Sequence, residues 1–256
     1  MALLHVNFFS EVLGQCTNME VILPQQAFGQ IGIESKEGGD SYPVLYLLHG
    51  MSDDCTIWGR RTSIERYASS LGIAVVMPSA HLSWYTDMVC GGNYFKFFAD
   101  ELPSICRDFF PKISSKREDN FVAGLSMGGY GALKLAFRRP EKFAFVGALS
   151  GAFDIKAFDY YPKLWEQIFG GMDKINGSEN DLFHLASEVK KSGKQIPEFY
   201  MSCGKDDYIF AHSEKMDKHL TDIGIEHTYG RFEGAHTWEY WDEHIQDILK
   251  KLPIKR

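Results

Sequence analysis

A serine between two glycines is the first feature of this sequence that could do chemistry. It lies in the pentapeptide Gly124-Leu125-Ser126-Met127-Gly128, which follows an apolar run and opens a helical pattern. A G-x-S-x-G sequence at a strand-to-helix turn presents its serine hydroxyl on a sharp, strained corner, as a nucleophile requires. The alternative is a glycine-rich turn that contains a serine by chance, so the rest of the chain must supply the partners of a nucleophile.

The first partner is an acid that follows the serine in the chain. A serine attacks a carbonyl carbon when a histidine accepts its proton, and a carboxylate fixes the tautomer of that histidine. Proteins with this type of turn place the acid before the histidine. Two aspartates, Asp206 and Asp207, follow an apolar run at 199–203. We predict that Asp207 is the acid because it has the Gly-x-x-Asp spacing after Gly204, and Asp206 is the alternative.

The second partner is a histidine, and five follow Asp207 in the chain. His236 lies in a short loop between the last strand pattern and the last helical pattern, and such loops hold functional side chains on a rigid scaffold. We therefore predict that His236 is the general base. The other four lie within helical or strand patterns, where packing or surface roles are expected: His212, His219, His227 and His244.

Two backbone N–H groups are expected to complete the site. A tetrahedral intermediate needs donors that point at its developing oxyanion. Met127 follows the serine at a helix N-terminus, where the helix dipole adds to the effect. The second donor is expected from Met51, in the tight turn that follows His49-Gly50. We interpret His49 itself as a structural hydrogen-bonding residue and not as a second base.

The elements that position these residues alternate between strands and helices. Continuous or alternating apolar runs predict strands at 5–13, 17–24, 42–48, 73–77, 120–125, 143–149, 198–203 and 226–232. Helical patterns are found at 62–71, 94–110 (interrupted by Pro103), 127–138, 212–223 and 237–252, with a mixed region at 157–193. This order predicts an α/β fold with a mostly parallel sheet covered on both faces. Ligands bind at the carboxyl ends of such strands, where all the candidate residues lie.

The segment at about 152–197 is rich in aromatic residues, and we predict that it forms a small cap over the site. An ordinary packed helical pair is the alternative. No repeat or linker divides the chain, so residues 1–256 are expected to form a single domain. The aromatic side chains of this segment include Phe153, Phe158, Tyr160, Tyr161, Trp165 and Phe169.

Composition excludes several classes of function. The 256 residues contain 27 Lys+Arg and 34 Asp+Glu, a net charge of −7 that argues against nucleic-acid and anionic-membrane partners. The 5 cysteines are odd in number and widely spaced, which argues against a disulfide framework and a metal site. With no basic residue before Lys36 and no membrane-length apolar run, we predict a cytoplasmic protein. The 14% aromatic content would suit a homo-oligomer interface.

These motifs resemble the esterase D group of α/β-hydrolases, which includes tributyrin-type carboxylesterases and S-formylglutathione hydrolases. The resemblance extends over nearly the whole chain. It implies an α/β-hydrolase fold, Ser126, Asp207 and His236 as catalytic residues, the Met51 and Met127 amides as the oxyanion hole, no cofactor, and a small acyl-ester substrate. The similar segments are His49-Gly50-Met51, Trp84-Tyr85-Thr86-Asp87, residues 124–132, Cys203-Gly204-Lys205-Asp206-Asp207 and residues 236–241.

One loop departs from the pattern of S-formylglutathione hydrolases, which resemble one another in a Gly-Leu-Thr-Cys-Thr sequence. Here the loop reads Gly50-Met51-Ser52-Asp53-Asp54-Cys55, so the cysteine is displaced and is interpreted as a loop thiol. The departure favours a serine carboxylesterase for short-chain acyl esters. The alternatives are an S-formylglutathione hydrolase, an acylated-sugar or aryl-acid esterase, an acyltransferase, or a non-catalytic binding module.

Overall fold

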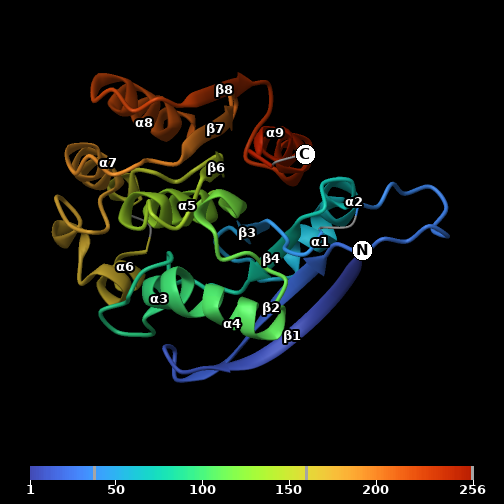
Figure 1. The fold of residues 1–256 in the computed structure, drawn as a ribbon. Helices are drawn as coiled ribbons and strands as arrows, with labels where there is room; N and C mark the ends of the chain where they lie inside the picture. Colours follow the sequence, from blue (N-terminus) through green and yellow to red (C-terminus); the bar gives the residue numbers. More distant parts are fainter. Residues whose placement is uncertain (37–38, 159–160, 255–256) are drawn as a thin grey trace.

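The protein is described by a computed structural model that covers residues 1–36, 39–158 and 161–254. Within these ranges, one sheet of 8 strands has the order β1-β2-β4-β3-β5-β6-β7-β8 (Figure 1). Strands β3 to β8 are parallel to their neighbours, and β2 joins them antiparallel to β4. The strands are β1 (Ala2–Ser10), β2 (Gln15–Leu23), β3 (Val44–Leu48), β4 (Ala74–Pro78), β5 (Asn120–Leu125), β6 (Phe145–Leu149), β7 (Glu198–Gly204) and β8 (Thr228–Phe232).

The central strands are short apolar runs because both of their faces are covered. Every residue of β3 to β6 is buried. Along β3, Val44, Tyr46 and Leu48 face one core, whereas Leu45 and Leu47 face the other. This alternation explains why β3 reads as a continuous hydrophobic run, as expected for a strand of a parallel sheet.

The opening hairpin is the one place where the predicted strand bounds are clearly wrong. The expected first strand at 5–13 is β1, three residues earlier in the chain, and Ser10 pairs with Gln15. The turn occupies the intervening four residues, and Gly14 adopts a left-handed φ of 65° while its N–H donates to the Ser10 carbonyl. The hydrophobicity of Leu13 predicts a strand position, but Leu13 packs against the core from the turn.

Helices cover both faces of the sheet in unequal numbers. One face carries α1, α2 and α9, with α2 and α9 side by side, and the other carries the remaining α-helices (Figure 1). The α-helices are α1 (Ile57–Arg61), α2 (Ile64–Ser69), α3 (Tyr94–Lys96), α4 (Leu102–Phe109), α5 (Met127–Arg138), α6 (Pro162–Phe169), α7 (Leu182–Lys191), α8 (Phe210–Asp222) and α9 (Trp238–Lys251). No helix in the described ranges is both long and apolar enough to span a bilayer.

The predicted helix at 94–110 is interrupted just before its proline. A π-helical segment, η1 (Phe97–Glu101), connects α3 to α4. Pro103 lies in the first turn of α4, and because it has no N–H it cannot bond the carbonyl four residues earlier. That carbonyl, of Ala99, accepts from Lys142 Nζ at 2.7 Å. The short helix α1, by contrast, has no expected counterpart in the sequence.

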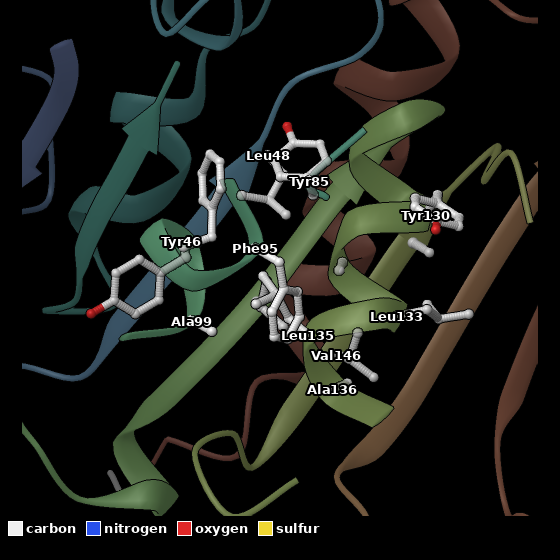
Figure 2. Packing of buried hydrophobic residues seen from close by; sticks show 14 of the residues in the cluster. Tyr46, Leu48, Tyr85, Phe95, Ala99, Tyr130, Leu133, Leu135, Ala136 and Val146 are labelled. Atoms are coloured by element: carbon white, nitrogen blue, oxygen red, sulfur yellow. The ribbon is translucent and has the colours of Figure 1, made fainter. Parts of the chain in front are cut away.

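Helix α5 lies at the centre of the larger core. Figure 2 shows its residues Tyr130, Leu133, Leu135 and Ala136 among side chains from the sheet and from the segments that follow β4. Tyr85 and Phe95 reach this core from the chain between β4 and α4. The helix that follows the Ser126 turn is therefore held on all sides by packed side chains, which gives the turn a rigid support.

The segment predicted as a cap packs on α5 through its loop at 179–180. The Tyr130 hydroxyl donates to the Asn180 carbonyl at 2.9 Å, and Lys134 Nζ donates to Asn180 Oδ1 at 2.6 Å. Arg138 forms an ion pair with Glu179 at 2.7 Å. The segment also contains α6, α7 and two 3-10 turns, η3 (Ile155–Ala157) and η4 (Met172–Lys174). Tyr160, one of its predicted aromatic residues, lies outside the described residues.

Candidate active site

Ser126 occupies the corner between β5 and α5 in a strained backbone conformation. Its φ of 51° and ψ of −116° lie in a region that L-residues rarely adopt. Its N–H donates to the Leu149 carbonyl at 3.0 Å, and its own carbonyl accepts from Ala152 N at 3.1 Å. These bonds come from the end of β6 and the chain beyond it, so the neighbouring strand holds the corner in place.

Gly128 allows the first turn of α5 to approach the end of β3. A Cβ atom at this position would lie 2.4 Å from the Leu48 carbonyl oxygen and 2.7 Å from the His49 carbonyl oxygen. No side chain fits there, because both neighbouring atoms belong to the backbone. The second glycine of the G-x-S-x-G sequence is therefore required by the close approach of two backbones.

The structure brings the predicted serine, histidine and aspartate together. His236 Nε2 lies 3.1 Å from Ser126 Oγ, and His236 Nδ1 lies 3.0 and 2.9 Å from the two carboxyl oxygens of Asp207. Asp207 follows β7, and His236 lies between β8 and α9. Three strand ends thus place a hydroxyl, an imidazole and a carboxyl in one line of hydrogen bonds. This is the geometry that activates a serine nucleophile.

The carboxyl of Asp207 is held in its ionised form. Burial, the largest single influence, would raise its pKa, but the hydrogen bond and charge of His236 act in the opposite direction and the net shift is downward. The backbone N–H of Ile209, which donates to Asp207 Oδ1 at 3.0 Å, also lowers it. Asp206, the alternative acid, is exposed and has only its backbone N–H bonded, to the Gly234 carbonyl. The structure thus places Asp207, and not Asp206, beside the histidine.

Two aromatic rings pack against the imidazole of His236. The Trp241 ring meets it edge-on at 4.8 Å between ring centroids, and the Tyr208 ring lies at 4.7 Å.

None of the other four candidate histidines contacts Ser126, and each has partners elsewhere. These partners are the Asp154 N–H for His212, Phe183 for His219, Asp217 for His227 and Asp247 for His244.

The turn after β3 approaches Ser126 closely, as an oxyanion-hole loop must. A Cβ atom on Gly50 would lie 3.7 Å from Ser126 Cβ and 2.6 Å from Leu125 Cδ1. Met51, the next residue, is partly buried, and Met127 is fully buried at the start of α5. The Met51 and Met127 amides therefore belong to two segments that converge on the serine.

His49 fixes this turn from within the core. Its Nε2 accepts the Ala80 N–H at 2.8 Å, so that nitrogen carries no proton, and Nδ1–H donates to the Gly50 carbonyl at 2.7 Å. Burial lowers the pKa of His49 to about 4, so the ring is neutral near neutral pH. The Gly50 carbonyl is one end of the peptide group whose other end is the Met51 N–H. The prediction that His49 is a structural residue agrees with these contacts.

Three residues near the site were missed or interpreted differently from the sequence. Burial raises the pKa of Asp53, in the same turn, to about 6, although the Gly50 N–H opposes this shift. Cys55 is a thiol in the loop before α1, as predicted, but it is buried, and burial raises its pKa. Ser150, which directly follows β6, is fully buried and its hydroxyl accepts the Trp241 Nε1–H at 3.2 Å. A signal for Ser150 exists in the sequence, because it directly follows a predicted strand.

Comparisons with known proteins agree with this geometry. Residues 10–252 match the model of a family described as putative esterases. An acetyl esterase of Caldicellulosiruptor saccharolyticus is 31% identical over 98% of this chain and 97% of its own length. FphF, a fluorophosphonate-binding serine hydrolase of Staphylococcus aureus, is 32% identical, with a TM-score of 0.89 and 99% of both chains covered.

A second solved structure has a similar degree of likeness. FrmB of Staphylococcus aureus, an S-formylglutathione hydrolase, is 33% identical, with a TM-score of 0.86 and 98% of both chains covered. These likenesses extend over the whole sheet and its helices. The chain therefore belongs to the esterase family, as its resemblance to esterase D proteins predicts, and it is a serine carboxylesterase with the α/β-hydrolase fold.

Proposed function

We propose that this carboxylesterase hydrolyses short-chain acyl esters through an acyl-enzyme on Ser126. The observation that carries the proposal is the continuous line of hydrogen bonds from Ser126 Oγ through His236 to Asp207. The name of the acetyl esterase relative supports a small acyl group. The roles follow from chemistry: Ser126 is the nucleophile, His236 is the general base and Asp207 orients and stabilises the imidazolium.

Acylation begins when the substrate carbonyl carbon approaches Ser126 Oγ. The hydroxyl proton passes to His236 Nε2 as the new C–O bond forms, and Nδ1–H stays bonded to Asp207. The Met51 and Met127 N–H groups stabilise the oxyanion of the tetrahedral intermediate. Collapse of this intermediate breaks the bond to the alcohol, which leaves with the proton from Nε2. Water then repeats the same steps and releases the acid.

The segment at 152–197 is proposed as the cap that limits acyl length. Trp165 of α6 packs against Trp84 with 5.2 Å between ring centroids, and Trp84 packs against Tyr130, one turn after Ser126. Both tryptophans are buried. Because these rings fill the space beside the first turn of α5, a long acyl chain has to displace packed side chains. We therefore expect turnover to fall from acetyl to decanoyl esters.

The test compares aryl esters of increasing acyl length with S-formylglutathione, for the wild type and two matched variants. Asp207→Asn is expected to lower kcat by about 10³- to 10⁴-fold, because an amide favours the wrong histidine tautomer. Asp206→Asn removes the adjacent, exposed carboxyl and is expected to change kcat less than twofold. Equal losses in both variants would contradict the assignment of the acid.

Two further outcomes decide between the alternatives. A fluorophosphonate should label the wild type at Ser126 and leave Ser126→Ala unlabelled. Labelling at another serine would overturn the choice of nucleophile. Faster turnover of S-formylglutathione than of acetyl esters would replace the ester proposal with the thioesterase alternative. Acyl transfer to an added alcohol in excess of hydrolysis would indicate an acyltransferase, and equal turnover of acetyl and long-chain esters would refute the cap.

We also propose a cytoplasmic location, a small-molecule substrate and no nucleic-acid or membrane partner. All five cysteines are free thiols, and two of them, Cys16 and Cys90, are exposed. Exposed free thiols persist in a reducing compartment. Fractionation of the native cells with an antibody against the chain tests the location, and a signal in the secreted fraction would refute it.

A further inference from the structure

Lys134 is a lysine enclosed in the larger core, and the reaction steps proposed above do not use it. It lies on α5, about two turns after Ser126, and it is 0% exposed. Its Nζ lies over the rings of Phe95 and Tyr130, both labelled in Figure 2, at 5.7 and 5.5 Å from their centroids. Burial, together with the nearby charge of Arg138, lowers the pKa of this amine well below the ordinary value of a lysine. A buried amine is costly unless it is hydrogen-bonded, so its partners should explain its position.

Two neutral oxygens from two separate segments accept hydrogen bonds from this amine. Lys134 Nζ lies 2.7 Å from Thr86 Oγ1, in the chain after β4, and 2.6 Å from Asn180 Oδ1, in the proposed cap. In the described ranges, its hydrogen-bond partners are these two oxygens and no carboxylate. The partners are 48 and 46 positions away along the chain. The amine therefore connects the helix that follows the nucleophile to the turn after β4 and to the cap.

The bond to Thr86 leads to the ring that is proposed to limit acyl length. Thr86 Oγ1 donates in turn to the Trp84 carbonyl at 2.9 Å, so two consecutive hydrogen bonds connect Lys134 to the Trp84 backbone. Trp84 has a φ of 50°, and such a strained conformation persists only where its surroundings fix it. Thr86 is fully buried, so bulk water cannot replace its bonds. The amine of Lys134 thus supports the strained backbone that directs the Trp84 indole.

The bond to Asn180 holds the cap at the same place. The Tyr130 hydroxyl donates to the Asn180 carbonyl at 2.9 Å, so Asn180 is bonded to α5 through its backbone as well as its side chain. The Trp84 ring packs against Tyr130 at 5.5 Å between centroids and against Trp165 of the cap at 5.2 Å. Trp84 therefore contacts one ring from α5 and one from the cap, and Lys134 connects these two segments.

We propose that Lys134 is a positioning residue of the acyl pocket: through its bonds to the turn after β4 and to the cap, it holds the Trp84 indole where it closes the pocket to long acyl chains. The inference rests on the proposed function, because it requires Trp84 and the cap to limit acyl length. The hydrogen bonds that join Ser126, His236 and Asp207 do not involve Lys134. Loss of the amine should therefore change which ester is preferred, with little effect on turnover of acetyl esters.

The experiment measures the ratio of kcat/KM for a decanoyl aryl ester to that for an acetyl aryl ester. Lys134→Met keeps an unbranched apolar side chain and removes the donor. It should raise this ratio about 3- to 10-fold, the range for one hydrogen bond, and lower kcat for the acetyl ester less than about threefold. The matched control is Lys142→Met, beyond the opposite end of α5, which removes a donor to the Ala99 carbonyl and should change the ratio less than about twofold.

A pair of variants at Thr86 keeps the test decisive even where Lys134→Met fails to fold. Thr86→Val has a similar shape but no hydroxyl, so both bonds between Lys134 and the Trp84 carbonyl are lost. It should raise the ratio in the same direction as Lys134→Met. Thr86→Ser keeps the hydroxyl and should keep the wild-type ratio. Equal ratios in Thr86→Val and Thr86→Ser would overturn the inference.

Tryptophan fluorescence reports on the ring itself. Trp84 is 2% exposed, so acrylamide should quench its emission weakly in the wild type. Quenching should increase in Lys134→Met and Thr86→Val, and the increase should be absent when Trp84→Phe is added to each. An increase that persists after Trp84→Phe would indicate a general loss of structure and would contradict the positioning role.

The outcomes distinguish this inference from the proposed function. A wild type without Ser126-dependent turnover would overturn the proposed function, and equal turnover of acetyl and decanoyl esters by the wild type would overturn its cap. A wild type that prefers acetyl esters, together with a folded Lys134→Met variant of the same preference, would overturn only the role of Lys134. An equal loss of turnover for both esters in Lys134→Met would show a purely structural role, and the inference would be wrong.

Discussion

Replacing His49 with a residue that does not titrate should reduce the pH dependence of the protein's stability by a measurable amount. The ring is 1% exposed, accepts the Ala80 N–H through Nε2 and donates to the Gly50 carbonyl through Nδ1. A second proton can enter only at Nε2, where it would face a donor. The folded protein therefore resists protonation of His49, whereas the unfolded chain accepts the proton at the ordinary pKa.

The magnitude and the sign follow from the shift. The pKa falls from 6.5 to about 4 on folding. At about 1.4 kcal/mol per pKa unit, this corresponds to about 3 kcal/mol. Between these two pH values the unfolded chain binds more protons than the folded protein, so stability rises with pH in this window. The contribution is complete above about pH 6.5 and is lost as pH falls toward 4.

The assay is urea unfolding of the wild type and His49→Gln between about pH 4 and 7. The glutamine cannot titrate, so any loss of packing is the same at every pH. The advantage of the wild type over the variant should shrink by about 3 kcal/mol from pH 7 to pH 4. Asp53, whose pKa is raised, titrates in both proteins and largely cancels from the comparison. Parallel plots of unfolding free energy against pH for the two proteins would refute a neutral His49 with hydrogen bonds at both ring nitrogens.

Three further substitutions test the geometry of the site. Gly128→Ala should lower the free energy of unfolding by about 2 kcal/mol in urea titrations, since the added Cβ would lie 2.4 Å from the Leu48 carbonyl oxygen. Asp53→Asn should raise stability by about 1 kcal/mol at pH 7 and not at pH 4, because the folded state disfavours the ionised form above its pKa of about 6 and partial exposure reduces the effect. Ser126→Gly should abolish ester turnover and raise the melting temperature, because its φ of 51° costs glycine little.

The elements around the nucleophile were predictable because their signals are local. The strand at 120–125 and the helix at 127–138 have the predicted bounds. An all-apolar run, a glycine-flanked serine and a helical pattern follow one another without a gap. The parallel sheet also followed from the sequence, because short buried strands alternate with helices. The choice between Asp206 and Asp207 depended on spacing, and the structure places Asp207 beside His236 because Gly204 and the next residues form a turn.

Residues that act through contacts between distant elements could not be predicted in this way. Ser150 and Trp241 form a hydrogen bond across 91 positions of the chain, and no local pattern predicts that the two residues meet. The raised pKa of Asp53 results from burial by the folded turn, which a pattern of charges does not reveal. The predicted bounds of the first strand are wrong for a related reason. Leu13 is apolar because it covers the core from a turn. Hydrophobicity alone does not distinguish this position from a strand.

Backbone strain in this protein is concentrated where the chemistry is expected. Within the described ranges, the non-glycine residues with positive φ all follow a parallel strand at its carboxyl end. They are Ser52 after β3, His81, Trp84 and Tyr85 after β4, Ser126 after β5 and Ser150 after β6. Each such residue costs about 1–3 kcal/mol, and a domain is stable by only about 5–15 kcal/mol. Six strained positions persist at one edge because the buried strands behind them are packed on both faces. The apolar runs that first predicted a parallel sheet therefore also supply the rigidity that the strained serine requires.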